Sequence, residues 1–233
     1  MPFVPPDRRA ITPGGEGRFP AFDVLAQADR WDEVTAGVVL ARLDPPPELS
    51  FFTPVEQATA GALFDQLLAQ HSDPKVPVLC LVDRRLALDE TDGWLYDDMP
   101  DDREAWRITL AALEQDASHG FGRPFHALDR DEQAELILSV QQATEWHGLH
   151  AGHVWSLWTR YACAAFYSHP WAWNEMGFGG PAYPRGYRTR GVGGREPWEV
   201  ADHAGRDPVP WGEWVEAAKR SHPRLGGARR VER

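Results

Sequence analysis

The sequence predicts an all-α protein: an irregular helical bundle around a buried central helix, followed by a long, ordered, aromatic C-terminal loop. Three segments begin with the residue pattern that caps the first turn of a helix. Behind each of them, apolar residues recur at the spacing of one helix face. Neither an Asn-Gly hairpin signal nor a sustained alternation of apolar and polar residues indicates a sheet.

The first helical patterns lie between Phe22 and Leu43, and a run of three prolines ends them. The clearest helix start follows, where Thr53 is the N-cap, Pro54 occupies the first helical position and Glu56 completes a capping box. The apolar stripe behind it predicts one buried face, which consists of Ala60, Leu63, Phe64, Leu67 and Leu68.

Three further helices are expected before the central one. Pro77 opens an apolar helical stretch. Asp101 with Glu104, and Asp129 with Glu132, repeat the capping pattern. The apolar stripes behind these two starts are Trp106, Leu110 and Leu113 in the first and Ala134, Ile137 and Leu138 in the second.

Residues 152–167 are the predicted central helix. Apolar side chains fill nearly its whole circumference, and a narrow stripe of Ser156, Thr159, Arg160 and Cys163 interrupts them. A helix that is apolar nearly all round is surrounded by its own domain or by a partner. Weaker helical patterns follow at "PWEVADHA" and "WGEWVEAAKRSH".

The expected aromatic loop covers residues 168–190. A long loop of this kind is either functional or disordered, and disordered segments are poor in aromatic residues. Its tryptophans and tyrosines suit stacking on a sugar, a small core beneath the loop, or contact with an acidic patch of a partner through the adjacent arginines. The residues alone leave these three alternatives open, and the candidate partner interface comprises His169, Trp171, Trp173, Asn174, Phe178, Tyr183, Arg185 and Tyr187.

The domain organisation follows from these patterns. We expect an extended arm at residues 1–20, one helical domain at 21–220 and a basic tail at 221–233. Cys80 and Cys163 stand in apolar runs, which favours small buried side chains over a disulfide or a catalytic role.

Composition limits the possible partners. The 233 residues carry a net charge of −11, which argues against nucleic acid and anionic membranes, because both attract clustered lysines and arginines. The longest apolar stretches are too short to span a bilayer, so no membrane insertion is expected. Arg8-Arg9 precedes no apolar segment, so we expect a cytoplasmic location unless a partner with its own signal carries the chain across a membrane.

The histidines of "HGLHAGHVW" are the candidate metal cluster, and they carry one alternative function, a stand-alone metal-dependent enzyme. On a helix, His147, His150 and His153 would fan over about a third of the circumference. The glycines at 148 and 152 argue against a rigid helix there, and the H-E-x-x-H motif is absent. A second alternative is a sugar-binding module that uses Trp171 and Trp173.

Other chemical signatures are weak. No nucleophile motif or nucleotide-binding glycine motif is recognisable, so we expect no catalytic residue, no metal and no bound cofactor in this chain. The acidic run "DETDGWLYDDMPDDRE" lacks the spacing of a calcium loop. It indicates a solvated face and a helix cap.

Four segments in this order resemble the gluconate 2-dehydrogenase subunit 3 family: "FFTPVEQATAGALFDQLL", "WRITLAALEQDA", "GRPFHALDRDEQAELIL" and the helix that runs into "HPWAWNEMGFGGP". The resemblance covers roughly residues 50–190. It implies an all-helical, non-catalytic small subunit that binds and stabilises a large FAD-dependent oxidoreductase of the glucose–methanol–choline (GMC) type. FAD would then belong to the large subunit, which oxidises gluconate, a sugar or a polyol, and a cytochrome subunit is a further possible partner. Small subunits of this family commonly carry a twin-arginine export signal, which is not recognisable here.

Overall fold

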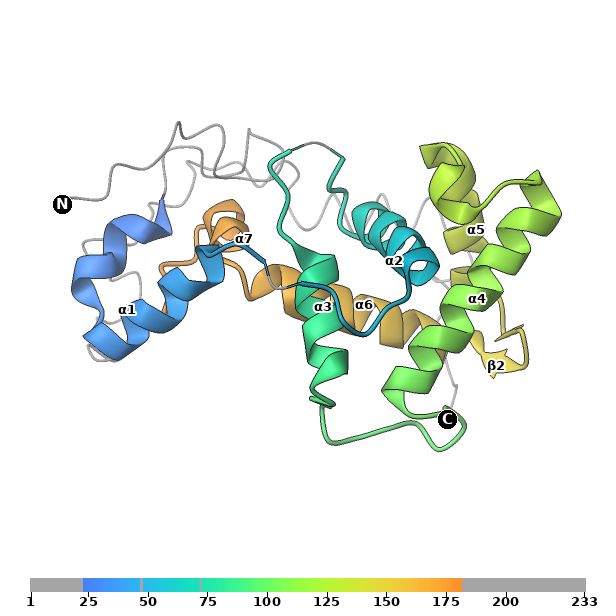
Figure 1. The fold of residues 1–233 in the computed structure, drawn as a ribbon, viewed down its shortest axis with the longest axis horizontal. Helices are drawn as coiled ribbons and strands as arrows, with labels where there is room; N and C mark the ends of the chain where they lie inside the picture. The colour runs from blue at the N-terminus through green and yellow to red at the C-terminus, as the bar shows by residue number, and fades with distance from the viewer. Residues whose placement is uncertain (1–22, 47, 72, 182–233) are drawn as a thin grey trace, which may run out of the picture. The chain divides into compact units, whose positions relative to one another are not determined.

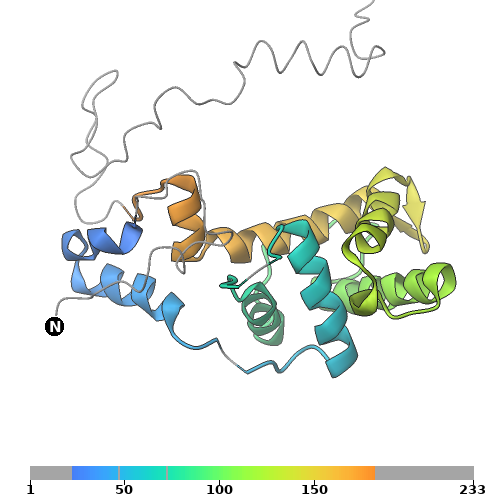
Figure 2. The same cartoon turned by 90° about the horizontal axis from the view of Figure 1, so that it is seen from above.

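The computed structural model describes residues 23–46, 48–71 and 73–181. Within these ranges the regular secondary structure is helical apart from one hairpin of two short strands, so the predicted all-α class is confirmed (Figures 1 and 2). The elements in chain order are η2 (Val24–Arg30), α1 (Glu33–Leu40), η3 (Ala41–Leu43), α2 (Pro54–Leu67), α3 (Val78–Ala87), α4 (Asp102–Phe121), η4 (Phe125–Ala127), α5 (Arg130–Gln142), β1 (Glu145–Trp146), β2 (Leu149–His150), α6 (Ala151–Tyr167) and α7 (Pro170–Met176).

Local sequence determines where α2 and α5 begin. The side chain of Thr53 accepts a hydrogen bond from the backbone N–H of Glu56, and the Glu56 carboxylate accepts one from the N–H of Thr53. Asp129 and Glu132 form the same capping box at α5. Each N-cap stabilises its helix by about 1 kcal/mol, and both boxes were predicted from the sequence.

A buried carboxylate fixes the chain that leads into α2. Asp83 of α3 is fully buried, and its two oxygens accept hydrogen bonds from three consecutive backbone N–H groups. The donors are Ser50 at 2.7 Å, Phe51 at 3.1 Å and Phe52 at 2.8 Å. The carboxylate therefore ties α3 to the turn before α2 and satisfies the N–H groups of Phe51 and Phe52, which would otherwise be buried unpaired.

The main core surrounds α6, as the sequence predicts. This helix contacts α2, α3, α4, α5 and α7, and α3 crosses it steeply in Figure 1. Trp158 is fully buried on α6, and its indole N–H donates to the hydroxyl of Thr109 on α4 over 3.1 Å. Trp106 lies edge-on against the ring of Tyr161, with ring centroids 5.8 Å apart. Aromatic side chains thus fill the centre of this core.

A second, smaller cluster joins η2 and α1 to α7. Its buried members are Val24, Leu25, Trp31, Val39 and Trp173. Asn174 of α7 accepts a hydrogen bond from the backbone N–H of Val24 over 2.7 Å. Gly180 lies directly against Trp31: it has a φ of +76°, and a Cβ placed there would be 2.5 Å from the indole ring. Only glycine fits this contact without a shift of the indole.

The segment 168–190 differs from the expected loop, because it begins with helix α7. Three signals in the sequence define this helix. The imidazole of His169 caps it, Pro170 occupies its first turn, and Gly177 with a φ of +67° ends it. The sequence prediction gave more weight to the many aromatic residues and glycines of this segment, and therefore assigned it to a loop. Residues 182–190, the arm at 1–20 and the tail at 221–233 lie outside the described residues.

Several side chains deviate from the predicted burial. Cys163 was expected inside but is exposed, because no described element covers the outer face of α6 there, and Cys80 is half-buried. Leu138 was expected on the buried face of α5 but is exposed. Ile137 and Val140 are the buried apolar residues of that helix, so the core face is rotated from the predicted one.

Candidate partner interface

Two of the three histidines of the candidate metal cluster pair with different carboxylates, and the third stacks on one of them. His147 lies in the hairpin turn with a φ of 49°, and its Nε2 is 2.8 Å from a carboxylate oxygen of Asp116. His153 lies in α6, with Nδ1 2.7 Å from Asp98. His150 precedes the helix and stacks on His153. As the glycines at 148 and 152 led us to expect, no single helix carries all three histidines, and the described residues contain no group of three or more His, Cys, Asp or Glu side chains that could hold a metal.

Three of the eight predicted interface residues lie inside the chain as folded. His169, Trp173 and Asn174 are buried and hold α7 in place. The indole N–H of Trp173 donates to the carbonyl of Tyr167 over 2.7 Å, and the ring edge meets Phe178. For Trp173 the structure therefore shows a small core, with no free ring face for a sugar.

The remaining predicted interface residues divide into two groups. Trp171 is half-buried against the main core and Phe178 is exposed, so both retain surface for contact. Tyr183, Arg185 and Tyr187 lie outside the described residues. An interface role for these five residues stays a prediction.

The environment of His169 makes it a neutral hydrogen-bonding group. Burial and the nearby charge of Arg42 lower the pKa of His169 to about 4, although a hydrogen bond with the Arg42 backbone partly opposes the shift. The unprotonated Nδ1 accepts the backbone N–H of Trp171 over 3.2 Å. This histidine is therefore a structural cap at neutral pH.

Residues 88–101, which connect α3 to α4, form a surface that we call the acidic loop. Two arginines hold it to the helices: Arg85 of α3 and Arg160 of α6 both bond the carboxylate of Asp92. Arg160 also bonds Asp102 over 3.2 Å, and the hydroxyl of Tyr161 donates to Asp102 over 2.6 Å. The loop is thus fixed at Asp92 by charged groups from two different helices.

Two groups of this network, Asp92 and Tyr161, keep their protonation states at neutral pH. Partial burial raises the pKa of Asp92, but the hydrogen bonds and charges of Arg85 and Arg160 outweigh it, so the pKa lies below its usual value. Burial, together with the hydrogen bond to Asp102 and its charge, raises the pKa of Tyr161 far above its usual value. The network therefore acts as a set of constant charges and donors that clamp the loop.

Trp94 stands at the exposed tip of this arrangement. The guanidinium of Arg160 lies 4.7 Å from the Trp94 ring centroid, within the range of a cation–π contact. Trp94 meets Tyr96 edge-on, and Tyr96 stacks on His153 with centroids 3.7 Å apart. Trp94 nevertheless remains 48% exposed and the adjacent Leu95 50% exposed. An anchored aromatic side chain is thus presented to the outside.

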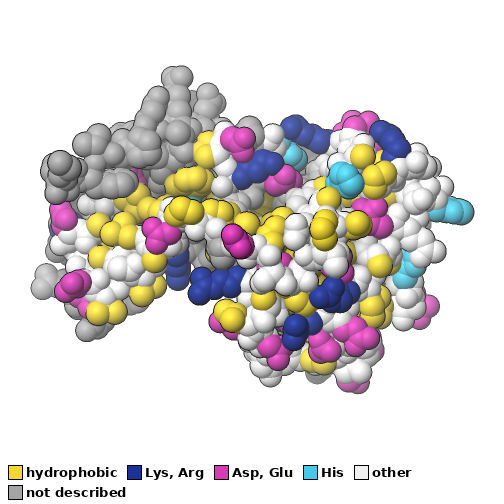
Figure 3. All heavy atoms as spheres, in the orientation of Figure 1, with side chains coloured by type: hydrophobic (Ala, Val, Ile, Leu, Met, Phe, Trp, Pro, Cys, Tyr) yellow, Lys and Arg dark blue, Asp and Glu magenta, His cyan; other side chains and the backbone are white. Residues whose placement is uncertain are grey.

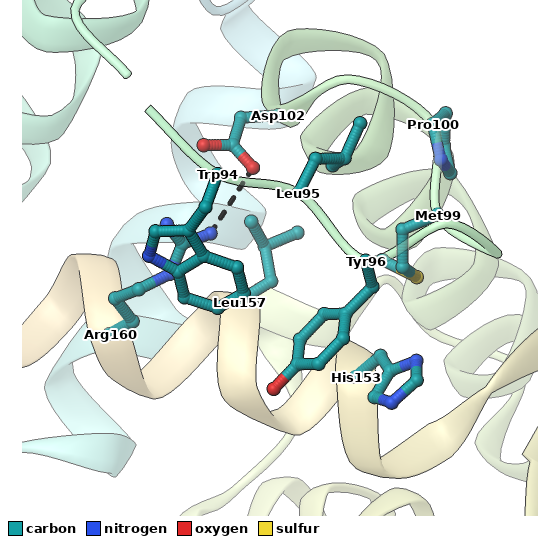
Figure 4. A pocket seen from close by; sticks show the side chains of 9 residues that line it. All are labelled: Trp94, Leu95, Tyr96, Met99, Pro100, Asp102, His153, Leu157 and Arg160. Carbon is teal, nitrogen blue, oxygen red and sulfur yellow. Dashed lines mark hydrogen bonds and ion pairs between the residues drawn. The ribbon is translucent and has the colours of Figure 1, made fainter. Parts of the chain in front are cut away.

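The hollows beside Trp94 do not enclose a substrate. Figure 4 shows the deeper one, between the loop and α6; its volume is about 10 Å³, room for about one water molecule. The second is an open hollow of about 390 Å³. Trp94, Leu95, Asp101 and Asp102 contribute to its lining. This arrangement suits contact with the side chains of another molecule more than catalysis on a small substrate.

Sequence reasoning missed this site. It assigned the acidic run to a solvated face, and most carboxylates of the run are indeed exposed. Figure 3 shows acidic side chains together with hydrophobic ones at the lower edge of the molecule, where the connection between α3 and α4 runs. The overlooked signal is the apolar pair Trp94-Leu95 within that run. Its anchor, Arg160, lies 66 residues later in the chain, so no local pattern in the sequence indicated the contact.

A second exposed apolar surface lies on α1. Val34 is 73% exposed and Val38 55% exposed, one helical turn apart, whereas Val39 is buried in the small cluster. Hydrophobic side chains gather over α1 in Figure 3. The helix is apolar on nearly all sides but covered on one, which is unusual for a surface helix.

The comparison with protein families agrees with the resemblance seen in the sequence. Residues 54–180, more than half of the chain, match the family model described as gluconate 2-dehydrogenase subunit 3. The matched range runs from α2 to just beyond α7 and contains the acidic loop, whereas η2 and α1 precede it. Comparison with curated proteins and with solved structures gave no match.

Proposed function

Because the chain belongs to the gluconate 2-dehydrogenase subunit 3 family, we propose that it is a non-catalytic small subunit that binds and stabilises a large FAD-dependent oxidoreductase of the GMC type. The match over residues 54–180 is the observation that carries this proposal. In it, FAD and the catalytic residues belong to the large subunit, which oxidises gluconate, a sugar or a polyol. A cytochrome subunit is a further partner in some versions of such a complex.

The geometry supports an accessory role. The acidic loop and α1 both present apolar side chains outward, as expected of a chain that is completed by a partner. His147 and His153 contact different carboxylates, His150 stacks on His153, and the hollow between the acidic loop and α6 has room for about one water molecule. Among the described residues, no helix is both long and apolar enough to span a bilayer.

The decisive experiment is purification of the tagged full-length chain from its native cells. We expect a yellow eluate with the absorbance bands of oxidised flavin and a large flavoprotein near one-to-one with this chain. The eluate is then assayed for reduction of an artificial dye with gluconate, sugars and polyols. The same tag on an unrelated acidic protein is the control. A colourless chain without a stoichiometric partner would contradict the proposal.

A further inference from the structure

We propose that the acidic loop is the docking surface for the large subunit, and that Trp94 and Leu95 enter an apolar recess of that subunit whose rim carries lysines or arginines. For the identity of the partner, this inference rests on the proposed function. The chemistry of the recess is inferred from the loop itself.

The negative charge of the acidic loop indicates which charge surrounds the apolar recess of the partner. Between Asp89 and Asp102 the chain has seven carboxylates and no lysine or arginine. Asp92 and Asp102 are neutralised within the chain by Arg85 and Arg160. The carboxylates that remain exposed around the apolar pair are Asp89, Glu90, Asp97, Asp98 and Asp101. A complementary surface carries positive charge around an apolar centre.

The structure of the loop prepares Trp94 for binding. Its ring is held by Arg160 and Tyr96, so little side-chain freedom remains to be lost on association. Tryptophan is also among the side chains that contribute most to protein interfaces. A rigid, half-exposed tryptophan beside an exposed leucine therefore has the properties of an interface anchor.

The open hollow beside Trp94 indicates how the partner fits. Trp94 and Leu95 provide its apolar lining, and Asp101 and Asp102 provide its carboxylates. An arginine or lysine suits such a hollow, because its alkyl stem covers apolar surface while its charged end meets a carboxylate. The contact thus interlocks: Trp94 enters the partner, and a basic side chain of the partner enters the hollow.

The exposed valines of α1 do not carry an equivalent inference. That surface has no charge pattern that would identify what covers it. The acidic loop, by contrast, specifies both the apolar centre and the charged rim of its partner.

The test measures binding of the full chain to the purified, FAD-loaded large subunit. Trp94→Ala and the double substitution Trp94→Ala/Leu95→Ala are compared with Leu138→Ala, an exposed leucine on α5 outside the loop. We expect the dissociation constant to rise by roughly 30-fold or more for the loop variants and to remain within about twofold for Leu138→Ala. Circular dichroism and thermal unfolding establish that each variant is folded.

A second set of variants tests the charged rim without touching the anchor. Glu90→Gln with Asp97→Asn removes two exposed charges from the loop. Wild-type binding should weaken as salt is raised, and this double variant should bind more slowly at low salt with a smaller salt dependence. Unchanged affinity in the folded Trp94 variants, or salt-independent binding, would show that the acidic loop is not the docking surface, although the two subunits still form a complex.

Two other outcomes also count against the inference. If the wild-type chain captures no flavoprotein, the proposed function and the docking surface both fail. If Trp94→Ala instead converts a dimer of this chain to a monomer by light scattering, a second copy occupies the surface and the large subunit does not.

Discussion

The imidazole of His169 illustrates how one buried side chain can control an element. It caps α7 while neutral, and its pKa of about 4 lies below the ordinary value of 6.5. Between these two values, the unfolded chain binds a proton that the folded chain does not. The contribution of neutral His169 to the free energy of unfolding is therefore complete above about pH 6.5 and is lost as the pH falls toward 4.

We predict that His169 makes the protein sensitive to mild acid. Its protonation should lower the free energy of unfolding by roughly 3 kcal/mol between pH 6.5 and 4. The measurement is urea unfolding at several pH values for the wild type and for His169→Asn. Asparagine retains a capping oxygen but does not titrate, so the variant should show a flatter pH dependence over this window. Parallel curves would contradict the role given to His169.

Gly180 is the second residue with a sharp expectation. Gly180→Ala places a methyl group against Trp31 at a positive φ, which should lower the free energy of unfolding by about 2–4 kcal/mol. Gly37→Ala is the matched control, because Gly37 lies in α1 with no atom within 4 Å of the place that the added methyl group would take, and it should gain about 0.5–1 kcal/mol. Thermal unfolding of both variants tests this contrast, and equal effects would refute it.

At the scale of elements, the helix starts were the most predictable part of the fold. The capping boxes at Thr53 and Asp129 are complete within four residues, so the sequence contains the whole interaction. The position of Trp94 depends on Arg160, and the small cluster depends on a contact between Val24 and Asn174, 150 residues apart. Such contacts depend on how helices pack together, and periodicity within one helix carries no information about them.

The link between α3 and the turn before α2 gives an element-scale prediction. Asp83→Ala leaves the buried N–H groups of Phe51 and Phe52 without an acceptor and removes the bond from Ser50, and should lower the free energy of unfolding by at least about 3 kcal/mol. Denaturant unfolding measures the loss. Asp97→Ala is the control, because this exposed aspartate should contribute less than about 0.5 kcal/mol. Similar losses in both variants would show that the buried hydrogen bonds are not the cause.

At the scale of the whole molecule, the family and the exposed apolar surfaces lead to one expectation: the chain gains stability from its partner. At a large-subunit concentration 100 times the dissociation constant, the stabilisation should be about 2.7 kcal/mol. The melting temperature of this chain should therefore rise with added large subunit and depend on its concentration. An unrelated flavoprotein at the same concentration is the control, and a melting temperature that does not respond to the large subunit would contradict the prediction.

The clamp on the acidic loop also bears on how this surface can change over evolutionary time. Arg85, Arg160 and Asp92 hold the loop from behind, whereas Trp94 and Leu95 face outward. On the proposed docking surface, substitutions at the two outward positions would alter partner choice at little cost to folding, while the clamp stays intact. The same framework can therefore be adapted to large subunits with different recesses, and a library randomised at these two positions is a direct route to engineered subunit pairs.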